Sequence, residues 1–186
     1  MELRYKLIPY VYAQARLASQ NGHPMLRTLF FEYPEDPTSW FVEDQYLFGT
    51  DILVAPLMED APERNVYLPP GLWTDYQTGE SYGGARWHAI SAGEIPAVML
   101  VRDGAAIPHI RLAQSTDRMD WSEIELAVYG AGSSSAEGLF SLPEDGALHV
   151  LRLEREADGF VLRGDPLEGR VEWNVRAVAT ERGRNA

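Results

Sequence analysis

The sequence of 186 residues contains no cysteine, which excludes disulfide bonds and thiolate metal sites. Basic residues are scarce, because 16 Lys and Arg stand against 28 Asp and Glu, and the formal net charge is −12. Such a chain repels a phosphate backbone, so nucleic acid is not an expected partner. No apolar run approaches the roughly 20 residues needed to cross a bilayer, and residues 1–6 do not open a signal peptide. We therefore expect a cytoplasmic protein without a membrane partner.

One segment has the periodicity of a helix, residues 3–20. Gly22 can take the left-handed backbone of a helix end, and Pro24 forbids continuation. Pro9 would remove a hydrogen bond inside a helix, so the helix either kinks or begins near it. The apolar stripe is formed by Leu3, Leu7, Tyr10, Val11, Leu17 and Ala18, with Gln14 as its polar exception.

From Pro24 onward the pattern changes to short runs of period two, separated by turn-forming residues. The 12 prolines and 16 glycines are spread along the chain, as an all-β protein with many turns requires. We predict a mainly β protein with two antiparallel β-sandwich domains, one preceding helix and no parallel sheet. The polar residues 109–120 are the predicted domain boundary, and residues 171–177 show the clearest strand alternation.

Four segments in order resemble family 31 glycoside hydrolases, the α-glucosidases and α-xylosidases. They are residues 4–12 (RYKLIPYVY), residues 24–29 and 31–34 (PMLRTL and FEYP), residues 44–56 (DQYLFGTDILVAP), and residues 64–75 with 101–108 (RNVYLPPGLWTD and VRDGAAIP). The third segment is the most specific. Two short cues, at residues 61–63 and 86–88, favour the α-xylosidase branch.

The resemblance implies a division into three parts. Residues 1–36 would be the last helix and the exit of a (β/α)8 barrel, residues 37–112 a proximal C-terminal β-sandwich, and residues 113–186 a distal β-domain. The chain would then be the non-catalytic C-terminal region of a retaining α-glycosidase, bracing the barrel and supporting oligomerisation. The helix stripe would bind the barrel of the parent enzyme or, without it, another copy of the chain.

Family members use an Asp nucleophile and an Asp general acid/base on the barrel, and no segment of this sequence matches those motifs. Retention requires two carboxylates about 5 to 5.5 Å apart around the scissile bond. We therefore assign no catalytic, substrate-binding, cofactor-binding or metal residue, expect no cofactor, and predict that the chain alone is inactive. Which sugar the parent enzyme cleaves is left open.

Several residues admit a functional interpretation besides the structural one. Asp44, Asp51, Glu59 and Asp60 could contain an acid/base pair, although turns and caps are the ordinary role of such residues. The four histidines, His23, His88, His109 and His149, lack the spacing of a zinc site.

The tryptophans Trp40, Trp73, Trp87, Trp121 and Trp173 could stack on sugar rings. Trp173 is expected in the core, and a core position is also favoured for Trp73, Tyr76 and Trp87. The alternative function is thus an independent carbohydrate-binding or protein-interaction module.

Overall fold

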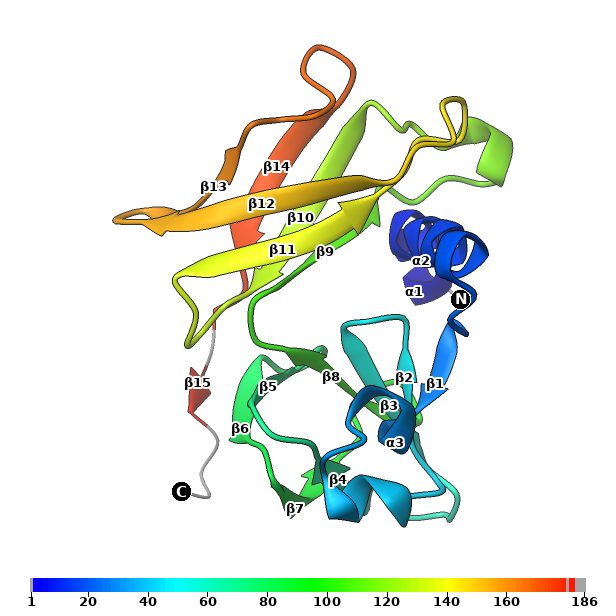
Figure 1. Ribbon diagram of the computed structural model, residues 1–186, viewed down its shortest axis with the longest axis vertical. Coiled ribbons are helices and arrows are strands. Elements are labelled where there is room, and N and C mark those ends of the chain that lie inside the picture. The colour runs from blue at the N-terminus through cyan, green and yellow to red at the C-terminus, as the bar shows by residue number, and fades with distance from the viewer. Residues whose placement is uncertain (1, 180, 183–186) are drawn as a thin grey trace. The chain divides into compact units, whose positions relative to one another are not determined.

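The structure, a computed structural model, describes residues 2–179 and 181–182 (Figure 1). The chain forms two compact units, of which unit 1 contains Met1–His23 and Gly104–Val178, and unit 2 contains Pro24–Asp103 and Ala179–Ala186. Strands dominate both units, which confirms the prediction of a mainly β protein. In the described part of the chain, no helix is both long and apolar enough to span a membrane.

Unit 2 is a sandwich of a large sheet and a small one. The large sheet has the strand order β1-β2-β3-β8-β5-β6-β15, and β4 pairs with β7 in the small sheet. Its strands are β1 (Leu26–Thr28), β2 (Tyr46–Phe48), β3 (Ile52–Pro56), β4 (Glu63–Leu68), β5 (Leu72–Asp75), β6 (Glu80–Gly83), β7 (Arg86–Ser91), β8 (Ala97–Arg102) and β15 (Glu181–Arg182). A short helix α3 (Leu29–Glu32) and a 3-10 helix η1 (Pro37–Trp40) lie between β1 and β2 in the sequence.

The core of unit 2 lies between these two sheets. Because alternate residues of a strand point to the same face, Leu53 of β3 and Leu100 of β8 enter the core together from the large sheet. Val66 of β4 and Ile90 of β7 enter it from the small sheet, and Trp73 of β5 fills the centre. The sandwich therefore closes on a continuous apolar layer.

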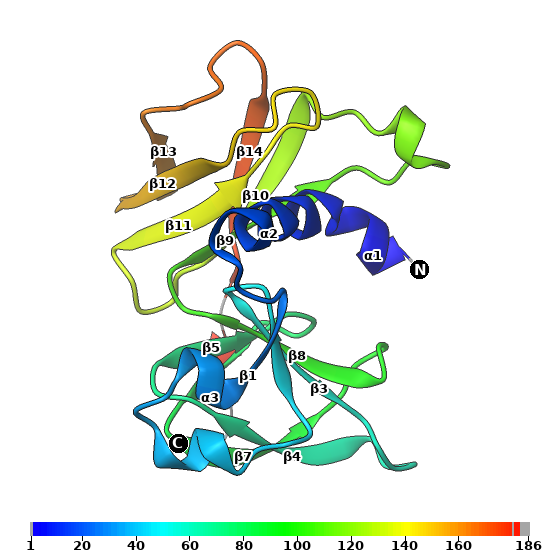
Figure 2. The same cartoon turned by 45° about the vertical axis from the view of Figure 1, so that its right-hand side comes forward.

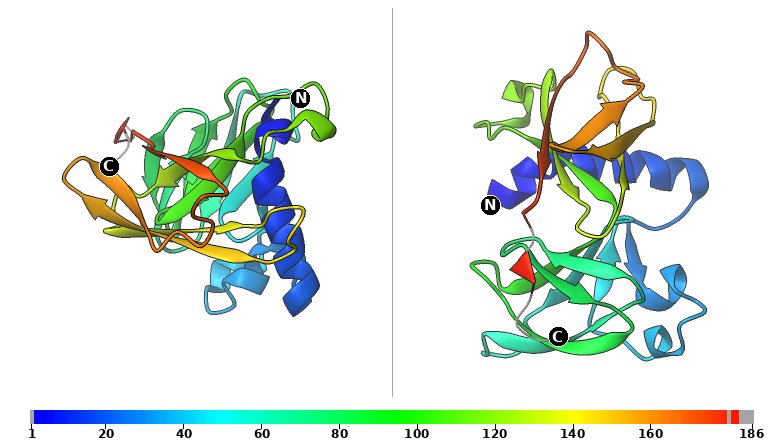
Figure 3. Two further views of the ribbon diagram at one scale, coloured as in Figure 1. Left: turned by 90° about the horizontal axis from the view of Figure 1, so that it is seen from above. Right: turned by 90° about the vertical axis from the view of Figure 1, so that its left-hand side faces the viewer.

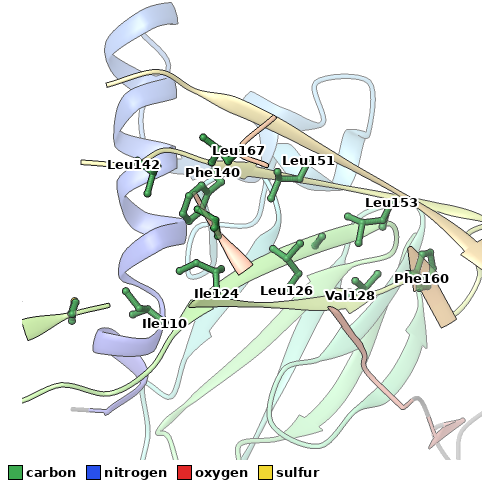
Figure 4. Close-up of a cluster of buried hydrophobic side chains, with 14 residues drawn as sticks. Ile110, Ile124, Leu126, Val128, Phe140, Leu142, Leu151, Leu153, Phe160 and Leu167 are labelled. Atoms are coloured by element: carbon green, nitrogen blue, oxygen red, sulfur yellow. The ribbon is translucent and has the colours of Figure 1, made fainter. Parts of the chain in front are cut away.

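Unit 1 is built from one six-stranded sheet with the order β13-β12-β11-β9-β10-β14. Its strands are β9 (Ala105–Ile110), β10 (Glu123–Tyr129), β11 (Ser135–Phe140), β12 (His149–Glu156), β13 (Gly159–Arg163) and β14 (Glu172–Ala177), and a 3-10 helix η2 (Thr116–Arg118) precedes β10. The sheet curls so that its edge strands β13 and β14 contact each other. Figure 4 shows the enclosed core, in which Ile124, Leu126, Phe140 and Leu151 point between the strands.

Parallel strand pairs contradict the prediction of no parallel sheet, and they include β11 with β9 in unit 1 and β15 with β6 in unit 2. β14 pairs with β10 in parallel along six residues, with Trp173 opposite Ile124 and Val175 opposite Leu126. After β13, the chain does not form an antiparallel hairpin with that strand. It passes to the other edge of the sheet, where β14 pairs with β10. The alternation of residues 171–177 correctly indicates a strand, but it carries no information about the strand beside it.

The N-terminal helix begins and ends near the residues that the sequence predicts. It is interrupted at Leu7, which separates α1 (Glu2–Lys6) from α2 (Ile8–Asn21), and Pro9 lies in the first turn of α2, where no N–H is needed. Gly22 has the left-handed φ of 75° and its N–H donates to the Ala18 carbonyl. Both proline and glycine therefore act as expected.

The helix packs on the core of unit 1 through residues outside the predicted stripe, while part of the stripe is buried as well. Tyr5 and Ile8 contact the core of unit 1, and Tyr12 meets Trp121 edge to face at 5.9 Å between ring centroids. Figures 2 and 3 show α2 lying along β9 and β11, with which it is in contact. In the predicted stripe, Leu7 and Tyr10 are buried. Leu3, Val11, Leu17 and Ala18 of the stripe are only partly buried. Binding of the stripe to the barrel of the parent enzyme or to another copy of the chain therefore stays a prediction.

The compact units also divide the chain elsewhere than the predicted domain limits. The chain passes between units after His23, after Asp103 and after Val178, whereas the sequence indicates a change within residues 109–120. The reason is strand pairing, because β9 runs antiparallel to β10 over its whole length. Residues 111–122 therefore connect two paired strands of one unit. Their polar composition resembles that of a linker between domains, which is why the sequence suggested a boundary there.

Candidate functional site

The carboxylates nearest the sequence motifs are held by arginines. Asp51 precedes β3, is buried, and accepts a hydrogen bond from Arg102 Nε at 2.8 Å and from the Thr50 hydroxyl at 2.6 Å. Asp44 pairs with the Arg64 guanidinium. Glu59 and Asp60 are exposed in the connection after β3. The structure thus gives Asp44 and Asp51 structural roles and does not bring the four residues into an acid/base pair.

The histidines lie in separate places. His88 Nε2 is 2.7 Å from the Gly83 carbonyl oxygen, and His149 Nε2 is 3.5 Å from Asp145. His23 is exposed, at the end of α2. Among the residues that the structure describes, no group of three or more His, Asp or Glu side chains could hold a metal ion.

His109 lies in a buried and charged environment. Its side chain is buried on β9, and its Nδ1 lies 3.5 Å from Glu125 Oε1, which also accepts from Arg176 Nη2 at 2.8 Å. Burial lowers the pKa of His109, against the opposing effect of Glu125. Burial would raise the pKa of Glu125, but the hydrogen bond and charge of Arg176 and the contact with His109 lower it overall. This cluster favours a neutral imidazole beside an ionised carboxylate.

The tryptophans separate into core and surface positions. Trp73 is 1% exposed and donates from Nε1 to the Pro69 carbonyl, and Trp173 donates to Asp165 while meeting the core of unit 1. The predicted core positions of Trp73 and Trp173 are therefore confirmed. Trp87 is 52% exposed and Trp40 is 56% exposed, so the core position favoured for Trp87 is wrong.

Trp40 is the final residue of η1, and this helix is held by its cap. The Asp36 carboxylate accepts from the Thr38 N–H at 3.1 Å and from the Ser39 hydroxyl at 2.9 Å, which satisfies donors at the helix start. The same carboxylate accepts from the buried Tyr67 hydroxyl of β4 at 2.7 Å. The cap is therefore anchored to the sandwich of unit 2.

The indole of Trp40 is fixed by two further contacts. Its Nε1 donates to the Pro34 carbonyl at 2.9 Å, and its ring stacks on Phe30 with centroids 5.2 Å apart and planes inclined by 19°. The next residue, Phe41, is 83% exposed. Two aromatic rings at this surface are thus presented to solvent, and Trp40 is held in one orientation.

An open hollow of about 520 Å³ lies beside these rings. It is lined by Pro34, Glu35, Pro37, Trp40 and Phe41. Sequence reasoning named only Trp40 among them. The signal that could have found the rest is the turn Pro34–Pro37 with two aromatic residues shortly after it, because side chains beside a surface turn tend to be displayed to solvent.

Comparison with known proteins places these features in a family. The model of the glycosyl hydrolase family 31 C-terminal domain matches residues 22–107, which contain the whole continuous part of unit 2, Pro24–Asp103. The chain belongs to glycoside hydrolase family 31 and carries its C-terminal domain. The match contains Trp40 and its hollow.

Individual relatives extend the likeness beyond that domain. The chain is 31% identical to an α-xylosidase of Saccharolobus solfataricus over 99% of its own length and 26% of the relative. It is 37% identical to α-glucosidase 2 of Bacillus thermoamyloliquefaciens over 64% of its own length and 15% of the relative. The solved structure of the family 31 α-xylosidase of Xanthomonas citri matches with a TM-score of 0.76 and 28% identity, over 95% of this chain and 21% of that one. The chain thus spans about a quarter or less of these relatives.

Proposed function

We propose that the chain is the non-catalytic C-terminal region of a longer retaining α-glycosidase and that it braces the catalytic barrel. The observation that carries the proposal is the match of 95% of the chain to about a fifth of the Xanthomonas citri α-xylosidase. The match supports a place inside a longer enzyme, and bracing is the role that we propose for it there.

The charged contacts of unit 2 support a bracing role. The pair of Asp51 and Arg102 joins the start of β3 to the end of β8, beside the backbone hydrogen bond from Arg102 N to Asp51 O at 3.0 Å. Arg27, which is buried on β1, pairs with Glu32 of α3 at 2.8 Å and donates to the Pro24 carbonyl. These contacts fix the backbone of the segment in which the family resemblance is strongest, and a rigid unit is what a brace requires.

We further infer that the parent enzyme acts on α-xylosides. The match to the Saccharolobus solfataricus α-xylosidase covers 99% of the chain, whereas the matches to α-glucosidase 2 of Bacillus thermoamyloliquefaciens and to the lysosomal α-glucosidase of Bos taurus cover 64% and 80%. The sequence cues at residues 61–63 and 86–88 favour the same branch.

The test is to isolate the native polypeptide that contains this sequence and to measure its intact mass and its activity. We expect a protein several times longer than this chain, which hydrolyses aryl α-xylosides faster than aryl α-glucosides. The chain alone should hydrolyse neither, because it would lack the two carboxylates that retention requires. Turnover by the chain alone that disappears on Asp51→Asn would overturn the proposal, as would a native product of this length only.

A further inference from the structure

Trp40 is held more firmly than an exposed side chain usually is. Its N–H is satisfied by Pro34, one ring face is covered by Phe30, and yet 56% of the residue remains in water. A tryptophan that served packing alone would bury its ring, as Trp73 does in the same unit. Leaving an indole in water forgoes hydrophobic stabilisation, so an ordered and exposed ring is suited to a ligand.

The fixation of Trp40 favours binding because little freedom would be lost. The cap at Asp36, its anchor at Tyr67 and the stacking on Phe30 restrict the ring before any ligand arrives. A preorganised side chain avoids the entropy cost of being immobilised in the complex. Trp87 is the useful contrast, since its ring is equally exposed but lines no part of the hollow.

The volume of the hollow is suited to the binding of a small ligand. Its volume of about 520 Å³ falls within the range of roughly 300–1,000 Å³ that is typical of small-molecule sites. The hollow is largely open to solvent and lined by five residues, which gives room for a ligand of a few rings.

The lining also defines the chemistry of the ligand. Two of the five residues are prolines, which have no N–H, and the one ionisable side chain is the Glu35 carboxylate. The wall therefore offers hydrogen-bond acceptors and apolar faces but few donors. The acidic lining and the net charge of −12 disfavour anions. A neutral molecule with apolar faces and hydroxyl donors at its edges fits this wall.

We propose that the hollow of Pro34, Glu35, Pro37, Trp40 and Phe41 binds a neutral oligosaccharide. A pyranose ring stacks by its C–H face on Trp40 or Phe41, and its hydroxyl groups donate to the Glu35 carboxylate. All five residues of the site belong to unit 2, so the chain alone contains them.

The experiment titrates the chain with maltotriose, isomaltotriose and xylotriose by calorimetry. We expect saturable binding of at least one sugar, about tenfold weaker in Trp40→Ala and in Phe41→Ala, and unchanged within about twofold in Trp87→Ala. Glu35→Gln should weaken binding by about threefold while the fold is retained. Phe41→Ala keeps the test valid if Trp40→Ala unfolds, since Phe41 is 83% exposed and contributes little packing.

Three results would overturn the proposal. They are the absence of saturable binding up to about 50 mM sugar, binding that survives both Trp40→Ala and Phe41→Ala, and binding that is lost in Trp87→Ala. Self-association that Trp40→Ala abolishes, without sugar binding, would assign the surface to a protein partner instead. Because hydrolysis and intact mass are measured separately, failure here leaves the proposed function of the parent enzyme standing.

Discussion

Replacing Gly84 with alanine should destabilise unit 2, because backbone rather than side chain fills the space that a Cβ atom would need. The new Cβ would lie far inside contact distance of the Pro69 carbonyl oxygen and 2.9 Å from the Gly71 carbonyl oxygen. Favourable contacts of carbon atoms lie near ~3.5 Å. The turn that contains Pro69 must therefore move, and a flexible side chain cannot absorb the shift.

The magnitude depends on the role of the Pro69 carbonyl. It accepts the Nε1–H of the buried Trp73 at 2.8 Å, so displacing it strains a hydrogen bond inside the core. Overpacking costs about 1–3 kcal/mol, and a buried donor left without a partner costs about 1–3 kcal/mol. Because the turn can relax in part, we expect the free energy of unfolding to fall by about 2–4 kcal/mol.

The neighbouring glycine provides a matched control. In Gly83→Ala the nearest atom to the new Cβ is Arg86 Nη2 at 3.5 Å, an ordinary contact with a flexible side chain. This variant should be neutral or stabilised by a few tenths of a kcal/mol, to about 1 kcal/mol at most. Urea unfolding measures both variants, and the indole N–H resonance of Trp73 reports on unit 2 specifically. A loss below about 0.5 kcal/mol in Gly84→Ala would refute the steric argument.

Three further predictions concern charge, pH and the helix. Asp51→Asn should lower the free energy of unfolding by about 1–3 kcal/mol, because the Arg102 guanidinium loses its ionised partner; urea unfolding measures it. Burial lowers the pKa of His109 below 6.5, so the unfolded chain binds the proton first, and stability should fall as pH drops below about 6.5. In His109→Asn, the free energy of unfolding should depend less on pH in this range. The loss of stability caused by protonation of Glu125 at lower pH should remain. Tyr12→Ala should loosen α2 from unit 1, seen as faster amide hydrogen exchange in α2.

Each of these predictions has a result that would contradict it. Asp60→Asn, at an exposed position, should leave the free energy of unfolding unchanged. A loss equal to that of Asp51→Asn would show that the ion pair with Arg102 is not the cause. An unchanged pH dependence in His109→Asn would show that its burial is not the source. Unchanged exchange in Tyr12→Ala would mean that the contact with Trp121 does not hold the helix.

Local chemistry made the ends of the helix predictable from sequence. Gly22 and Pro9 act within one turn of their own position, so their effect does not depend on the rest of the fold. The packing face of the N-terminal helix could not be read in the same way, because the contact of Tyr5 in α1 or Ile8 in α2 with the core is recognised only when its partner is known. Likewise, β14 lies parallel to β10 because of the path of the chain between them, and the alternation of residues within β14 does not reveal which strand it pairs with.

The candidate site was harder to predict for a related reason. In the sequence, every tryptophan could stack on a sugar ring. Only the tertiary structure distinguishes the buried Trp73 from the exposed Trp40. The hollow also depends on residues such as Pro34 and Pro37, which look like ordinary turn formers in the sequence. Pro34 and Pro37 shape the backbone beside the ring of Trp40, and that arrangement exists only in the folded unit.

Tyr67 connects the two exposed tryptophans, and this affects how the sugar-binding test is interpreted. Its hydroxyl donates to the Asp36 cap that positions Trp40, while its ring lies 5.5 Å from the ring of Trp87. Removing Trp87 exposes one face of Tyr67 but leaves its hydrogen bond to Asp36 in place. The cap that positions Trp40 receives the Tyr67 hydroxyl and makes no use of the ring contact with Trp87. Trp87→Ala should therefore preserve the hollow, which Trp87 does not line, and it is a valid control.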